Sequence, residues 1–149
     1  MPNKEISLLI ILILASMTVA ATFLASGVLF GSNTIFNEGN VNAIGVGIYW
    51  EDGCINNVSK IDWGYLAAGA THNVTIYIRN EGNVPMTMNM TSEEWNPSHA
   101  STYITVIWDY EGHVVDPYSV TEVVITLSVS QNVTNITSYS FDITIVGSQ

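Results

Sequence analysis

The hydrophobic and polar positions of this chain follow two patterns, one before residue 30 and one after it. The first is a continuous apolar run from Ile6 to Phe30 that contains no charged residue and no proline. Because an α-helix rises about 1.5 Å per residue, a run of this length can cross the roughly 30 Å hydrocarbon core of a bilayer. The pattern therefore predicts one transmembrane helix over residues 6–30.

From residue 43 onward, apolar residues alternate with polar ones, which is the period of a half-buried β-strand. The clearest stretches run from Ser119 to Val129 and from Ser138 to Val146, where the Val, Ile, Leu and aromatic side chains fall on one face. Other strands are expected at residues 43–50, 61–63, 72–80, 85–90 and 103–109. About seven short strands without an amphipathic helix among them predict an antiparallel β-sandwich, either immunoglobulin-like or jelly-roll-like.

The sequence Asn-Glu-Gly-Asn at residues 80–83 separates two of these strands. Gly82 is expected at the positive-φ position of a G1 bulge, a conformation that glycine adopts without steric cost. The pattern therefore predicts a tight hairpin with Asn80, Gly82 and Asn83 as its turn residues.

The two patterns divide the chain into four parts. Residues 1–5 form a short N-terminus, residues 6–30 the transmembrane helix or uncleaved signal anchor, residues 31–42 a polar, turn-rich linker, and residues 43–149 the sandwich domain. A cleaved signal peptide is the alternative for the second part. The apolar core of a signal peptide usually has about 7 to 15 residues, so the length of this run favours a retained anchor.

Charge predicts the orientation of the chain. Lys4 is the only basic side chain before the apolar run, whereas the part after Phe30 has 12 acidic residues against two basic ones, Lys60 and Arg79. The positive-inside bias then predicts a cytoplasmic N-terminus and an extracellular domain, with residues 6–30 in contact with the lipid bilayer. Nucleic acid is excluded as a partner, because two basic residues cannot neutralise a row of phosphates.

Five Asn-x-Ser/Thr sequons, all after the apolar run, agree with this orientation. Their asparagines are Asn57, Asn73, Asn89, Asn132 and Asn135. A β domain rich in Asn, Ser and Thr also generates sequons by composition alone. As a set, the five predict N-glycosylation of an extracellular face.

No group of residues forms a recognisable catalytic or cofactor-binding motif, so we expect neither enzymatic activity nor a cofactor. Cys54 is the only cysteine, which rules out an internal disulfide; we expect it to be buried, with a bridge between chains as the alternative. Two sets of side chains could bind a metal, although core packing and solvated loop charge are the more typical roles. These sets are Met86, Met88 and Met90, and Asp109, Glu111 and Asp116.

The stretches AGATHNVTIYIRNEGNVPMTMNM, at residues 68–90, and SFDITIVG, at residues 140–147, resemble the immunoglobulin-like (CARDB-like) cell-surface modules of archaea. The resemblance covers roughly residues 43–147 and implies a surface β-sandwich without catalytic residues. The order of apolar segment, linker and sandwich is also similar to that of TasA-like biofilm-fibre and archaeal bundling-pilus subunits. That similarity implies donor-strand assembly, with about residues 34–50 as the donor.

Two functions follow as expectations. The first is a membrane-anchored, glycosylated surface protein with a structural, adhesive or protein-interaction role, which associates with itself or with other envelope proteins. The second is a secreted filament subunit, assembled after the N-terminal segment has been cleaved off. The two differ in whether the segment at residues 6–30 is retained.

Overall fold

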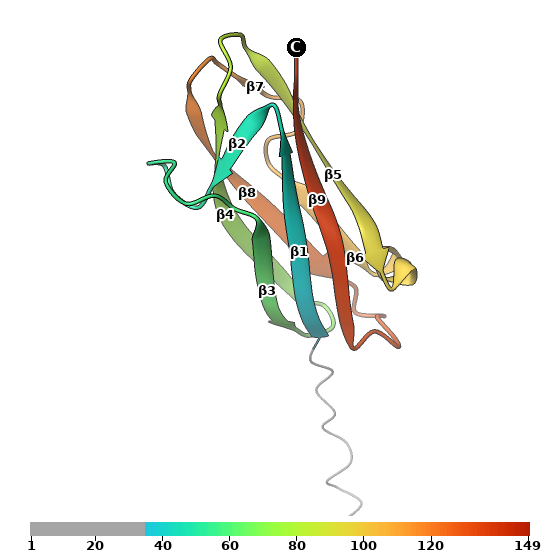
Figure 1. Cartoon of the computed structure of the whole chain (residues 1–149). Coiled ribbons are helices and arrows are strands. Elements are labelled where there is room, and N and C mark those ends of the chain that lie inside the picture. The colour runs from blue at the N-terminus through green and yellow to red at the C-terminus, as the bar shows by residue number, and fades with distance from the viewer. Residues whose placement is uncertain (1–34) are drawn as a thin grey trace, which may run out of the picture. The chain divides into compact units, whose positions relative to one another are not determined.

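The computed structural model describes residues 35–149, which form a β-sandwich (Figure 1). The predicted short N-terminus and the predicted helix at residues 6–30 lie outside the described residues. Within residues 35–149, no helix is long and apolar enough to span a membrane.

Nine strands of the described part form two sheets, which confirms the predicted all-β sandwich. The five-stranded sheet has the order β3-β1-β9-β5-β7, and the four-stranded sheet has the order β2-β4-β8-β6. The predictions of about seven strands and of antiparallel pairing throughout are wrong in detail, because β1 and the two-residue β7 were not expected and β1 pairs with β9 in parallel. All other pairings are antiparallel. The strands are β1 (Ile35–Ile44), β2 (Val46–Tyr49), β3 (Lys60–Leu66), β4 (Thr71–Asn80), β5 (Met86–Asn96), β6 (Ile104–Trp108), β7 (Val114–Val115), β8 (Val120–Val129) and β9 (Ser138–Ser148).

The core lies between the inner faces of the two sheets and comes from the alternation seen in the sequence. In β8, the buried residues are Val123, Ile125, Leu127 and Val129, and in β9 they are Tyr139, Phe141, Ile143 and Ile145. Both sets are the predicted ones. Because successive side chains of a strand point to opposite faces, the residues between them form the outer surface of each sheet.

The expected linker at residues 31–42 is wrong over its second part, because Ile35–Ile44 form β1. This strand lies inside the five-stranded sheet, paired with β3 on one side and with β9 on the other. The polar residues of β1 have low β propensity, so the strand was not predicted from the sequence. A central strand gains its stability from its two neighbours rather than from its own β propensity. Figure 1 shows β1 beside β9, with both strands running in the same direction.

The expected single strand at residues 43–50 is also wrong. Gly45 has a φ of +80° and separates β1 from β2, which belong to different sheets. Val46 and Ile48 are buried as predicted, but Trp50 lies beyond the strand and is exposed. One positive-φ glycine thus turns the chain from one layer of the sandwich into the other.

The predicted hairpin at Asn80, Gly82 and Asn83 is contradicted as well. β4 belongs to the four-stranded sheet and β5 to the five-stranded sheet, so the two strands do not pair. Gly82 is not among the described glycines with positive φ. Residues 81–85 instead form an arch that crosses from one sheet to the other.

The expected strand at residues 85–90 is longer than predicted. β5 continues to Asn96, and a 3₁₀ helix, η1 (Ser98–Thr102), then leads into β6. The pairing of β5 with β9 is irregular between Glu93 and Asn96, where the register shifts. This bulge directs Trp95 onto Phe141, with the ring centroids 4.3 Å apart.

Candidate functional site

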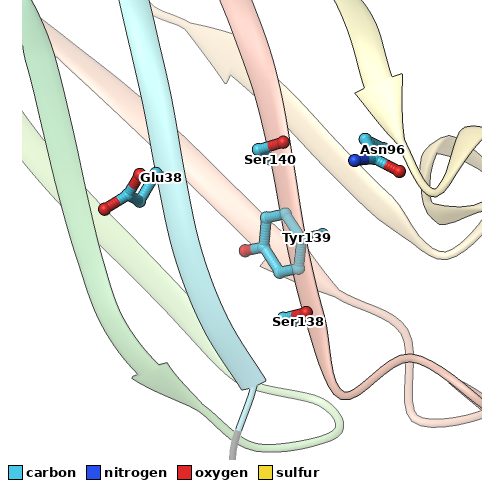
Figure 2. A pocket seen from close by; sticks show the side chains of 5 residues that line it. All are labelled: Glu38, Asn96, Ser138, Tyr139 and Ser140. Atoms are coloured by element: carbon cyan, nitrogen blue, oxygen red, sulfur yellow. The ribbon is translucent and has the colours of Figure 1, made fainter.

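A polar pocket of about 250 Å³ lies on the five-stranded sheet, near the end where β1 and β9 begin (Figure 2). Three strands contribute to it: Glu38 comes from β1, Asn96 from the end of β5, and the remaining residues from β9. The β9 residues are Ser138, Tyr139 and Ser140. Because β9 lies between β1 and β5, residues far apart in the sequence meet here.

The pocket presents hydroxyl, amide and carboxylate groups, which can hydrogen-bond to a polar ligand. The Glu38 carboxylate is paired with Lys60 of the neighbouring strand β3. The lining contains neither histidine nor cysteine, the side chains that most often act as base or nucleophile near neutral pH.

Tyr139 is the buried member of this group, with only 4% of its surface exposed. Figure 2 shows its ring between Ser138 and Ser140 along β9, with the hydroxyl directed toward β1. That oxygen has no hydrogen-bond partner among the described residues. Burial raises the pKa of the Tyr139 hydroxyl well above its ordinary value of 10.0, because a phenolate without hydrating water is destabilised.

The shifted pKa of Tyr139 predicts a loss of stability at high pH. The folded protein retains the hydroxyl proton above pH 10, where the unfolded chain releases it, so the free energy of unfolding falls as the pH rises further. The expected slope is at most about 1.4 kcal/mol per pH unit. Urea denaturation between pH 8 and pH 11 should show this decline in the wild type and a weaker one in Tyr139→Phe.

The matched comparison works because Tyr49 and Tyr77 titrate in both proteins. Their pKa values are raised chiefly by hydrogen bonds to Glu81 and Glu122. Their contribution is therefore common to the wild type and Tyr139→Phe. Equal slopes in the two proteins would contradict the assignment to Tyr139.

All five sequon asparagines are exposed in the structure. Asn73 lies on β4 and Asn89 on β5, so these two side chains lie on the outer faces of opposite sheets. Asn57, Asn132 and Asn135 lie in the connections before β3 and before β9. A glycosylating enzyme can thus reach sites on both faces and on the loops of the folded domain.

Asn80, predicted as a turn residue, is instead a fully buried polar residue, with 0% of its surface exposed. Its Nδ2 donates to the carbonyls of Val84 and Val115, at 2.7 and 3.0 Å, and its Oδ1 accepts from the Gly82 backbone N–H at 2.8 Å. The exposed Asn83 has no such role. A buried amide with its polar atoms satisfied specifies the local fold.

The acidic residues considered as a cation site do not form one. Glu111 Oε2 accepts from Trp108 Nε1 at 2.5 Å and from the Met90 backbone N–H at 3.1 Å, and Asp109 Oδ1 accepts from the Val124 N–H at 2.9 Å. No group of three His, Cys, Asp or Glu residues within residues 35–149 could hold a metal ion. Met88 is buried, and Met86 and Met90 pack against the core, which confirms core filling as the role of the methionine row.

Cys54 lies in the loop between β2 and β3 and is half-exposed, so the expectation of a buried residue is wrong. Its backbone φ is 54°, and its thiol contacts the carbonyl of Asp52 at 3.5 Å. Partial desolvation raises the pKa of the Cys54 thiol, which lowers its thiolate content near neutral pH.

Comparison of the sequence with protein-family models gave no match, and a search of curated proteins gave none either.

Proposed function

We propose that the protein is a membrane-anchored, glycosylated cell-surface protein of immunoglobulin-like type, with an adhesive or structural role and no catalysis. The apolar run at residues 6–30 would anchor it in the cell membrane with the N-terminus in the cytoplasm, and the sandwich would lie outside the cell. The single observation that carries the proposal is the exposure of all five sequon asparagines on the domain that follows this run.

The charge of the domain supports an extracellular role without nucleic acid or anionic lipid headgroups as partners. Both basic side chains of the described part are paired, Lys60 with Glu38 and Arg79 with Glu81, the latter at 3.8 Å. The remaining carboxylates leave the surface strongly acidic. Such a surface repels phosphate groups and remains soluble at high protein concentration.

The position of β1 supports a load-bearing attachment. β1 is the first described element after the apolar run, and it is hydrogen-bonded on both sides. A force along the axis of β1 would load its ladders with β3 and β9 together. Many hydrogen bonds then resist the force at once, which suits a domain held at a cell surface.

Fractionation of native material tests the anchor, and mass spectrometry tests the glycans. We expect the protein in the membrane fraction, with its N-terminal sequence starting at Met1 or Pro2. Chemical deglycosylation should lower its mass, and Asn→Gln replacement of the five sequon residues should abolish that shift. A soluble protein, or a native mass equal to that of the bare chain, would refute the corresponding part of the proposal.

The alternative proposal is a secreted filament subunit, and the pairing of β1 favours it. β1 fills a slot between β3 and β9, and the same segment of a neighbouring copy could fill that slot by donor-strand complementation. Such a subunit would begin near residues 21–34 after cleavage. N-terminal sequencing therefore separates the two proposals, and sedimentation of native material as fibres would support the second.

A further inference from the structure

β6 forms one edge of the four-stranded sheet and is paired only with β8. Its pairing shows which of its backbone groups are free. The Ser130 N–H donates to the carbonyl of Tyr103 and the Asp109 N–H donates to that of Val124, so the odd-numbered residues bond toward β8. Because hydrogen-bonded positions alternate in an antiparallel pair, the N–H and C=O groups of Ile104, Val106 and Trp108 point to the open edge.

The other three sheet edges of the described part are blocked. Along β2, residues 56–58 continue the pairing, with the Val58 N–H donating to the Ile48 carbonyl at 2.9 Å. β3 carries two charged residues and a bulge at Gly64, whose φ is +67°. β7 has two residues, and next to it Glu111 accepts the Met90 N–H of β5. These are the devices by which proteins keep sheet edges from pairing.

The residues of β6 themselves include none of these devices, and the charged side chain beside the strand, Glu111, accepts hydrogen bonds from Trp108 Nε1 and the Met90 N–H. The sequence of β6, Ile-Thr-Val-Ile-Trp, contains no charge, glycine or proline. Ile107 is 57% exposed on the outer face, and a groove of about 210 Å³ beside the strand is lined by Met90, Val106, Ile107, Trp108 and Glu111. An uncharged edge of β-branched residues is the form of strand to which another strand adds.

We propose that β6 is a self-association edge, which pairs antiparallel with β6 of a second copy about a twofold axis at Val106. In this register Val106 lies opposite its own equivalent, and Ile104 opposite Trp108 of the second copy. All the outward backbone groups of the strand then find partners. On the outer face, Thr105 lies opposite the second copy's Ile107, which covers the exposed isoleucine.

The absence of charge along β6 favours a second copy over a charged partner. No residue from 104 to 108 is charged, so the pairing brings no like charges into direct opposition. The two Asp109 residues lie about 20 Å apart along the paired strands, at about 3.3 Å per residue. That separation exceeds the Debye length of about 8 Å at physiological ionic strength, so their repulsion is screened.

The sequon on the four-stranded sheet, Asn73, leaves this edge open. Asn73 pairs with Thr126, which pairs with Ile107, so Asn73 and β6 are separated by β8. With strands about 4.8 Å apart, a glycan on Asn73 starts about 10 Å from β6 and points away from the sheet face. A glycan on Asn73 would thus hinder contacts through the outer face of this sheet and not contacts along the β6 edge.

The twofold axis also sets the orientation of the two copies. It is perpendicular to the sheet, so it reverses the strand direction and places the β1 starts of the two copies at opposite ends. The strand directions of two packed sheets differ by only about 30°, so the axis reverses the strand direction in the five-stranded sheet, which contains β1, as well as in the four-stranded sheet. Resting on the proposed anchor, the pairing then joins copies in two facing membranes, which is an adhesive contact.

Cysteine cross-linking of the full chain tests the register. In a Cys54→Ser background, Val106→Cys would place two cysteines directly opposite each other, with Cα atoms about 5.5 Å apart, within disulfide range. Thr105→Cys and Ile107→Cys are matched controls, because their symmetry-related Cα atoms lie about 8 Å apart, beyond that range. We expect an oxidised dimer at least about fivefold more abundant for Val106→Cys, and equal yields at the three positions would overturn the pairing.

A second measurement does not depend on cross-linking. In detergent, analytical ultracentrifugation of the full chain should show a concentration-dependent dimer. Val106→Lys, which places like charges directly opposite each other, should be monomeric, whereas Thr75→Lys on the central strand β4 should still dimerise. A wild-type monomer at all concentrations, or an undisturbed dimer of a folded Val106→Lys variant, would overturn the proposal.

The opposed orientation is tested with phosphatidylcholine vesicles that carry the full chain. We expect wild-type vesicles to aggregate and Val106→Lys vesicles to remain dispersed. Dispersed vesicles of a wild-type chain that dimerises in detergent would overturn the adhesive contact. Failure of the proposed anchor is a separate result, because it appears as loss of the native protein from the membrane fraction.

Discussion

Replacing Asn80 with alanine is expected to lower the free energy of unfolding by about 2–4 kcal/mol, because one buried and two half-buried backbone groups then lose their partners. These groups are the carbonyls of Val84 and Val115 and the N–H of Gly82. Each buried polar group left without a hydrogen bond costs about 1–3 kcal/mol. Urea denaturation followed by tryptophan fluorescence measures the change.

Asn83→Ala is the matched control for this prediction. Asn83 lies in the same arch between β4 and β5 but is exposed, so its replacement should change stability by no more than about 0.5 kcal/mol. If Asn80→Ala were as stable as Asn83→Ala, the buried amide of Asn80 would not be the group that stabilises the arch at residues 81–85.

Asn80 also shows why the connection after β4 could not be predicted. Its neighbours in the sequence, Glu81, Gly82 and Asn83, fit a hairpin as well as an arch. The contact that decides between them is the bond to Val115, 35 residues further along the chain. A turn type can be predicted from local sequence only when local contacts determine it.

The strands that were predicted correctly have their decisive information within a few residues. In β4, Val74, Ile76 and Ile78 face the core, while Thr75, Tyr77 and Arg79 face outward, as the alternation indicates. Period-two burial depends only on the strand having one face on the core.

β1 and the pocket were not predicted, because both depend on tertiary contacts. A strand that contains Asn, Glu and Gly has little β propensity, and β1 is stabilised by its two neighbours. The small size of Gly39 matters here, since a Cβ atom at this position would lie 3.3 Å from Trp63 Nε1. The pocket combines Glu38 with Ser138, a pair that only the parallel pairing of β1 with β9 brings together.

The position of β1 makes its packing relevant to both proposed functions. An anchored protein needs β1 to stay in its own sheet under load, whereas a filament subunit needs it to be replaceable by the same segment of a neighbour. The side chains beneath β1 therefore determine how firmly the segment is held. Phe141 is the most direct probe, because it lies opposite Gly39 in the pairing of β9 with β1.

Phe141→Ala is expected to lower the free energy of unfolding by about 3–5 kcal/mol, the usual cost of removing a buried phenyl ring. Phe141 is 1% exposed and stacks on Trp95 at a ring-centroid distance of 4.3 Å and an interplanar angle of 13°. A Cβ atom on Gly39 would lie 3.6 Å from its ring, so removal of the ring opens a cavity directly beneath β1. Hydrogen exchange should then show the β1 amides losing protection before those of β4 and β8.

Two further variants separate the ring from general loss of packing. Phe141→Leu keeps most of the volume and should cost about 1–2 kcal/mol, with β1 still protected. A double-mutant cycle with Trp95→Leu should give a coupling energy of about 0.5–1.5 kcal/mol for the stacked pair. If the β1 amides of Phe141→Ala exchanged no earlier than those of β8, the ring would stabilise the core as a whole rather than β1 in particular.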